Sequence, residues 1–138
     1  MKSDWMRAEA YLLMKRFGRV EFDVEHFWWF WVHRFPLPPG FNKEESGLLV
    51  ELDVTYPFTA PKNCYLNRNI RSSTGDPIDH YFSGSYHNKF FSKGWAWLSL
   101  HIDGWKPDAN IVRGDNLLRY CDLVYLTLEG LARQKGEG

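Results

Sequence analysis

Apolar residues recur at helical spacing near the start of the chain. Within residues 4–17, Trp5, Ala8 and Leu12 share one face of a helix. Gly18 follows directly, and glycine readily takes the left-handed backbone conformation that ends helices. The pattern predicts an N-terminal amphipathic helix that stops at Gly18.

A second helical pattern occupies the end of the chain. It starts after Asp115, a residue type that caps helix N-termini, and it runs to about Arg133. One face of this predicted helix is apolar. The residues of that face are Leu117, Leu118, Cys121, Val124, Leu128 and Leu131.

Several short segments between the two helices have the composition of strands. Branched and aromatic residues dominate them, and some alternate between apolar and polar positions. The predicted strands are 19–24, 27–32, 47–53 and 63–66. Three prolines and a glycine make 35–42 a loop, and the prolines of 56–61 exclude a central strand there.

The region after these strands is polar and has little periodicity. We expect residues 67–93 to form a long loop, and such loops inside a compact domain are uncommon and often functional. Residues 95–101 form a short strand or turn. The order of helix, antiparallel strands, long loop and helix indicates an α+β fold. No linker or repeat interrupts the 138 residues, which fit a single domain spanning 1–138.

The charge balance narrows the classes of partner. The chain has 17 basic and 17 acidic residues, so its formal net charge is zero. This balance argues against electrostatic capture of nucleic acid or of an anionic membrane. No apolar run approaches the roughly 20 residues of a membrane-spanning helix, and the charged N-terminus is unlike a signal peptide. We expect a cytoplasmic protein without nucleic-acid or membrane partners.

Cysteine and aromatic content point to reduced thiols and to protein binding. Cys64 and Cys121 are the two cysteines, and without a CxxC pair a structural zinc site is not expected. In a reducing cytoplasm both thiols are expected to be free. With seven Trp, seven Tyr and ten Phe, we expect some rings at a partner surface.

Two motifs in the centre of the chain resemble those of ubiquitin-conjugating (E2) domains. Residues 56–62 read YPFTAPK, which is similar to the proline-rich turn after the third E2 strand. Further on, Trp97 lies three residues after Gly94 and eight before Trp105, and Pro107 completes a Trp-x-Pro motif. E2 enzymes carry their catalytic Cys at this spacing. The resemblance therefore places Trp97 at the nucleophile position.

The closer resemblance is to prokaryotic E2 family E, a bacterial E2-like group. Residues 35–42 read FPLPPGFN, and 95–101 read WAWLSLH, with one residue fewer between the tryptophans than in the family. The similarity covers roughly residues 20–130. It implies a UBC-like (E2) fold with an N-terminal helix, a four-stranded antiparallel meander, a long active-site-like loop and a C-terminal helix.

The resemblance also implies partners. Members belong to bacterial operons that encode a ubiquitin-like protein, an E1-like (ThiF-type) adenylating enzyme and a JAB-type metalloprotease. No cofactor is implied. We expect this chain to bind the ubiquitin-like protein and its E1.

An indole cannot form the thioester through which an E2 transfers its cargo, so ordinary transthiolation at Trp97 is excluded. Trp97 is then either a core residue or an aromatic surface against the tail of the ubiquitin-like protein. The residues expected to contact that tail are Trp97, His87, Asn88, Ser99 and His101. In the E2 alignment His87 takes the place of a conserved His and Lys89 that of an Asn, and a shift of one residue would let Asn88 supply the amide.

Whether the protein is an enzyme is left open by the sequence. One alternative is a conjugating enzyme with Cys64 or Ser99 as nucleophile and His87 or His101 beside it, although burial is the expected role of both cysteines. Another is an unrelated binding module whose aromatic residues hold a hydrophobic partner. A metal site is less favoured because its spacing is not diagnostic. Its ligands would be Asp79, His80, His87 and His101.

Overall fold

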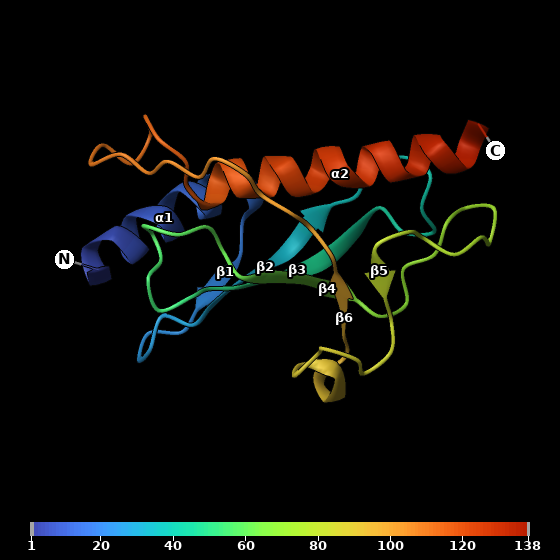
Figure 1. The fold of residues 1–138 in the computed structure, drawn as a ribbon, viewed down its shortest axis with the longest axis horizontal. Helices are drawn as coiled ribbons and strands as arrows, with labels where there is room; N and C mark the ends of the chain where they lie inside the picture. The colour runs from blue at the N-terminus through green and yellow to red at the C-terminus, as the bar shows by residue number, and fades with distance from the viewer. Residues whose placement is uncertain (1, 138) are drawn as a thin grey trace.

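The computed structural model describes residues 2–137, with side chains through Arg133, and has two helices over one face of a six-stranded antiparallel sheet (Figure 1). The helices are α1 (Lys2–Phe17) and α2 (Leu117–Glu137). The strands are β1 (Val20–Phe22), β2 (Trp29–Pro36), β3 (Glu45–Glu51), β4 (Asn63–Asn67), β5 (Tyr81–Phe82) and β6 (Trp95–Leu98). Their order in the sheet is β1-β2-β3-β4-β6-β5, and a 3-10 helix, η1 (Phe91–Lys93), precedes β6.

The α+β class is confirmed, but the sheet is larger than the resemblance implied. It has six strands, so the expected four-stranded meander is not confirmed in that form. The two additional strands are β5 and β6, and β5 formed within the region predicted to be a loop because Tyr81 and Phe82 pair with Leu98 and Trp97. Such pairing joins residues distant in sequence, which local periodicity does not reveal.

Strand β2 extends further than predicted. A register shift after Val32 lets Phe35 pair with Ser46 and Pro36 with Glu45. Pro36 is tolerated because it occupies the last position of the strand, where a missing N–H costs little. The loop predicted over 35–42 therefore starts two residues later.

The helix ends follow from capping residues. Gly18 has φ 84°, and its N–H donates to the Met14 carbonyl at 2.9 Å, as predicted for the end of α1. At the start of α2 the cap is Asn116, whose Oδ1 accepts from the Arg119 N–H at 2.9 Å. The prediction of Asp115 was wrong, since that carboxylate accepts from the Lys106 N–H at 2.7 Å.

Between the helices and the sheet lies the main apolar core. Alternation along the strands directs one set of side chains towards the helices and the other set away from them. The fully buried residues of this core come from both helices and from the helix-facing side of the sheet, and they include Met6, Leu13, Phe30, Val32, Leu48, Cys64, Leu66, Leu98, Val124 and Leu128. Neither helix of the described chain has the length and apolar character needed to cross a bilayer.

A buried carboxylate joins the N-terminal helix to two distant segments. Glu9 is 1% exposed and accepts hydrogen bonds from Trp5 Nε1, from the Tyr56 hydroxyl and, at 2.6 Å, from the Leu117 N–H. Trp105 Nε1 in turn donates to the Pro57 carbonyl at 2.8 Å. These bonds bring the proline-rich turn and the Trp-x-Pro motif together although 48 residues separate Pro57 and Trp105.

Candidate functional site

Trp97 lies on the face of the sheet that the helices do not cover. Its neighbour in β4 is Tyr65, and the same alternation places Glu51 on this outer face. A second apolar cluster forms here, distinct from the main core. Its buried members are Leu49, Tyr65 and Trp95, and Trp29, Trp31, Phe90 and Trp97 pack against them.

Beside Trp97 is a pocket of about 530 Å³, which we call the Trp97 pocket. Four segments form it: the end of β3, the first half of β4 with the residue before it, the middle of β6, and the loop before η1. Its lining residues are Glu51, Lys62, Asn63, Tyr65, His87, Asn88, Lys89 and Trp97. The volume falls within the range of small-ligand sites.

Glu51 forms the charged centre of the Trp97 pocket. It is 4% exposed, and its carboxylate accepts from Lys89 Nζ at 2.5 Å, from the Tyr65 hydroxyl at 2.8 Å and from Asn63 Nδ2 at 3.1 Å. Burial by itself would raise the pKa of Glu51, but these donors prevail and lower it. Glu51 is therefore a carboxylate at neutral pH, and its bond to Lys89 holds the loop before η1 against the sheet.

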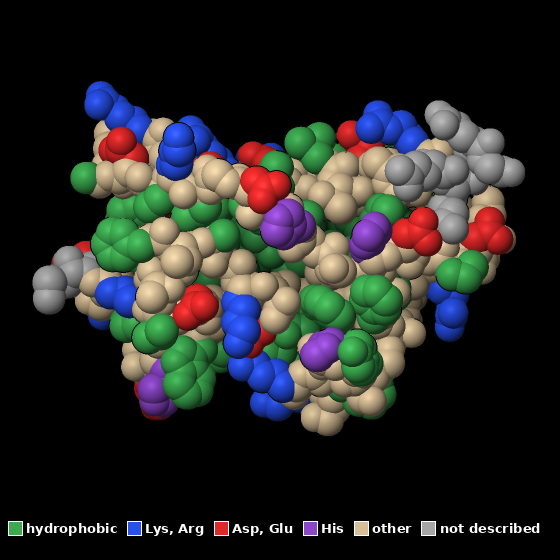
Figure 2. Space-filling view, in the orientation of Figure 1, with side chains coloured by type: hydrophobic (Ala, Val, Ile, Leu, Met, Phe, Trp, Pro, Cys, Tyr) green, Lys and Arg blue, Asp and Glu red, His purple; other side chains and the backbone are tan. Residues whose placement is uncertain are grey.

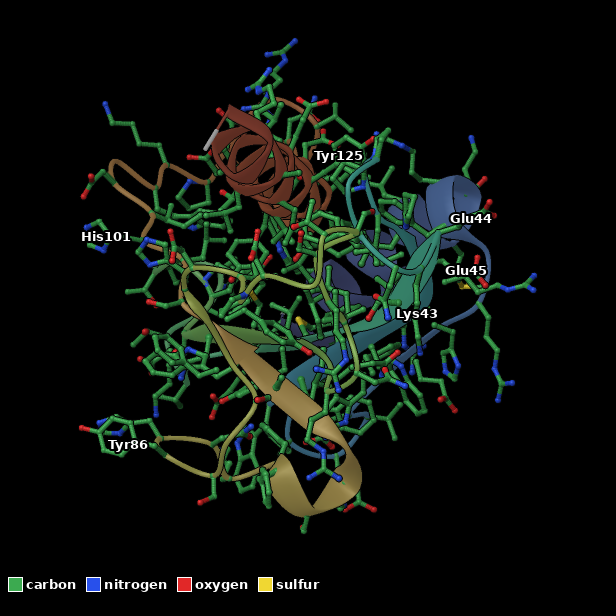
Figure 3. The ribbon with its side chains drawn as sticks, turned by 90° about the vertical axis from the view of Figure 1, so that its right-hand side faces the viewer. Lys43, Glu44, Glu45, Tyr86, His101 and Tyr125 are labelled. Atoms are coloured by element: carbon green, nitrogen blue, oxygen red, sulfur yellow. The ribbon has the colours of Figure 1, made fainter. Side chains whose placement is uncertain are left out.

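Aromatic side chains border the pocket at Trp97. The ring of Phe82 lies 5.2 Å from that of Trp97, and the His87 ring meets it nearly edge-on at 5.9 Å. Tyr86 is 74% exposed and contacts His87 at 4.1 Å. In Figure 3 Tyr86 extends outward on its loop, and Figure 2 shows histidine and hydrophobic side chains close to a group of Lys and Arg side chains. The surface here combines exposed rings with positive charge.

Asn88 supports the site from beneath. Its side chain is buried, donates to the Trp95 carbonyl at 2.7 Å and accepts from the Phe90 N–H at 2.9 Å. Strand β5 pairs only with Trp97 and Leu98 of β6, so it does not reach Trp95. The Asn88 side-chain amide donates to the Trp95 carbonyl in place of a backbone N–H from a longer β5. Because both ends of the amide are engaged, Asn88 fixes the loop that carries His87 and Lys89.

Ser99 and His101 lie outside the Trp97 pocket. The Ser99 N–H donates to the His80 carbonyl at 2.7 Å, just beyond the end of β6. His101 is exposed and pairs with Asp103 at 2.9 Å, and Figure 3 places it well apart from Tyr86. Within residues 2–137 no hydrogen bond joins Ser99 to either His87 or His101, so no nucleophile and base pair is assembled.

Cys64 lies on the opposite face of the sheet from Trp97. It neighbours Leu98 in the sheet, is 0% exposed and belongs to the main core. Burial raises the pKa of its thiol to about 12, and burial likewise raises that of Cys121. Both thiols are therefore protonated and inaccessible, which are poor properties for a nucleophile.

This burial predicts that the native protein will not react with a thiol reagent. In the native state we expect no modification by 5,5′-dithiobis(2-nitrobenzoate), followed by complete modification of Cys64 and Cys121 in denaturant. Ser92→Cys, at an exposed position in η1, is the positive control and should react rapidly without denaturant. Modification of Cys64 under native conditions at a rate similar to that control would contradict the burial argument.

Sequence reasoning missed the residues that give the pocket its charge. Glu51, Lys62, Asn63 and Tyr65 were not among the candidates, whereas Lys89 was noted through the alignment. One local signal existed, because Glu51 is a charged residue that directly follows the apolar run Leu48–Val50. Lys89 lies 38 positions after Glu51 in the sequence. The two side chains form an ion pair only because β3, β4 and β6 pair and the loop before η1 folds against them.

The Glu51–Lys89 ion pair predicts how the loop responds to a mutation. Glu51→Gln removes the charge that holds Lys89, and we expect opening of the loop to cost roughly 1.4 kcal/mol less, so that trypsin cleaves after Lys89 about tenfold faster. Limited proteolysis with mass spectrometry measures this rate. Glu45→Gln, which removes a surface partner of Arg34, is the matched control and should leave it unchanged. Equal rates for the two variants would show that the ion pair does not hold the loop.

A metal centre does not form from the candidate ligands. Among the residues described, no group of three or more His, Cys, Asp or Glu side chains is placed to hold a metal ion. His87 instead contacts Trp97 and Tyr86, and His101 pairs with Asp103.

Comparison with known protein families gives a match. The family model described as Prokaryotic E2 family E matches residues 9–129. These bounds include the buried Glu9, the proline-rich turn, the whole Trp97 pocket and most of α2. No curated protein and no solved structure matches the chain.

Proposed function

Because the chain belongs to prokaryotic E2 family E, we propose that it is the E2-like component of a bacterial pathway that conjugates a ubiquitin-like protein. It binds this ubiquitin-like protein and the E1-like enzyme that activates it, and it forms no thioester of its own. A JAB-type metalloprotease is a third expected partner. Since adenylation by the E1 consumes ATP, we place this activity in the cytoplasm.

The observation that carries the proposal is the position of Trp97 in an open pocket. Transthiolation needs a thiolate that can reach the acyl carbon. The residues lining the Trp97 pocket include no Cys, Ser or Thr, and Cys64 faces the main core. This chemistry supports recognition of the tail and argues against its covalent capture.

The tail of the ubiquitin-like protein would lie along the exposed rings. An extended chain that ends in glycines can approach an aromatic surface closely because it has no side chains in the way. Trp97 and His87 supply this surface, and Asn88 holds the loop that positions His87. Ser99 and His101, which were expected to contact the tail, would do so only if the tail continued beyond the pocket.

Reconstitution tests the proposal. The protein is mixed with the E1-like enzyme and the ubiquitin-like protein from its own operon, with ATP, and the mixture is analysed by size-exclusion chromatography and intact mass spectrometry. We expect a noncovalent complex at micromolar concentrations and an unchanged mass for this chain. The absence of any complex would overturn the proposal.

A second candidate function is conjugation through Ser99. This residue lies two positions after Trp97, just beyond the end of β6, and is the Ser or Thr nearest to Trp97 along the chain. The same mass measurement would then reveal a covalent adduct that disappears in Ser99→Ala. An adduct that disappears instead in Cys64→Ala would require Cys64 to leave the core. Membership of the family argues against the alternative of an unrelated binding module.

A further inference from the structure

We infer that the Trp97 pocket selects a free C-terminal carboxylate, so that the protein receives the unactivated or released ubiquitin-like protein and not its thioester-linked form. The inference rests on the proposed function, because it specifies the chemical state of the tail that this site binds. The observations that support it are the net positive charge of the pocket and the kinds of reactive side chain that line it.

The pocket holds one more positive charge than its own residues neutralise. Lys62 and Lys89 both line it, and Glu51 is the single acidic residue among the lining side chains. Glu51 is paired with Lys89, whereas Lys62 makes no salt bridge to any residue in the described part of the chain. A ligand carboxylate would supply the missing negative charge.

Lys89 is held in place for a ligand. One N–H of its ammonium group points to Glu51 at 2.5 Å, and an ammonium group has three donors. The Lys89 side chain is still 58% exposed, so its other donors remain open to the pocket. A fixed ammonium group loses less conformational freedom on binding than a free one, which favours affinity.

A tail held as a thioester does not match the pocket. A thioester has no negative charge at its acyl end to pair with Lys62, and its transfer to this chain would need a thiol or alcohol nucleophile. Tyr65 carries the one hydroxyl among the lining residues, and it donates to Glu51 at 2.8 Å. Burial also raises the pKa of Tyr65, which keeps the phenol protonated. The pocket can therefore retain a carboxylate, and its lining offers no free thiol or alcohol to take over the acyl chain of a thioester.

A pair of peptides tests this inference on the full-length protein. The probes are acetyl-Leu-Ala-Gly-Gly with a free carboxylate and the same peptide as a C-terminal amide, titrated while NMR follows the Trp97 indole N–H. We expect the free acid to bind about tenfold more tightly, the gain of roughly one charge-assisted hydrogen bond. Added salt should reduce this preference because the pocket is open to solvent.

Two lysine variants provide the matched comparison. Lys62→Gln should lower the affinity for the free acid to that for the amide and leave the amide unaffected. Lys43→Gln, in the segment before β3 and outside the pocket (Figure 3), should change neither. Equal affinity for the two peptides, no detectable binding of either, or a preference that survives Lys62→Gln would each overturn the inference.

Comparing the peptide titration with the reconstitution experiment separates this inference from the proposed function. If the complex with the ubiquitin-like protein and its E1 forms but the peptides show no preference for the free acid, the carboxylate inference fails alone. If no complex forms with the intact partners, the proposed function fails. A thermal melt of Lys62→Gln verifies its fold, which is expected to be intact because Lys62 is exposed.

Discussion

Replacing Trp97 with Ala is expected to lower the affinity for the ubiquitin-like protein by at least about 100-fold. Large aromatic residues at the centre of an interface commonly contribute 2 kcal/mol or more, and about 2.7 kcal/mol corresponds to this factor. Trp97 has this character because it is half-buried, contacts Phe82 and His87, and borders the pocket. Isothermal titration calorimetry with the intact ubiquitin-like protein measures the change.

Two further variants serve as controls for the Trp97→Ala measurement. Trp97→Phe keeps an aromatic ring next to Tyr65 in the sheet and should retain most of the affinity. Trp28→Ala removes another exposed indole, which is 55% exposed and stacks on His26 away from the pocket, and should leave binding unchanged. An equal loss for Trp97→Ala and Trp28→Ala would show a general effect of aromatic surface, and an undiminished affinity of Trp97→Ala would exclude this site as the binding site.

The second large effect concerns pH and the buried Glu9. Burial raises the pKa of Glu9 from 4.5 to about 7, despite hydrogen bonds from Tyr56, Leu117 and Trp5 that act to lower it. Between pH 4.5 and about 7, Glu9 is therefore protonated in the folded state and ionised in the unfolded chain. Since the native state binds more protons there, its stability is fully present below pH 4.5 and decreases as pH rises through about 7.

The expected size of this decrease is about 3 kcal/mol in the free energy of unfolding. Urea denaturation at several pH values between pH 5 and 8 measures it for the wild type and for Glu9→Gln, which cannot titrate. The difference between the two proteins should change by this amount, because every other titrating group is common to both. The contribution of Glu51, whose pKa is lowered, is lost only in more acidic solution. A constant difference across the range would show that Glu9 is ionised in the native protein throughout.

The sequence determined the helices because their signals are local. Apolar spacing in residues 4–17 and the glycine after it suffice for α1, since each turn packs a repeating face and Gly18 ends it. Three short motifs in family order likewise indicated prokaryotic E2 family E, which the family match confirms. Spacing from Gly94 and to Trp105 also placed Trp97 at the nucleophile position, an assignment that stays a prediction.

The tertiary structure alone decided which polar groups meet at the candidate site. Sequence patterns grouped Ser99, His101 and Cys64 with Trp97 because they are near it or chemically suited to catalysis. Pairing of β4 with β6 instead turns Cys64 to the core and Trp97 to the outer face. In the same way, Glu51 and Lys89 became partners through strand pairing and loop closure. Contacts of this kind depend on register and on long-range burial, and neither leaves a periodic signal in the chain.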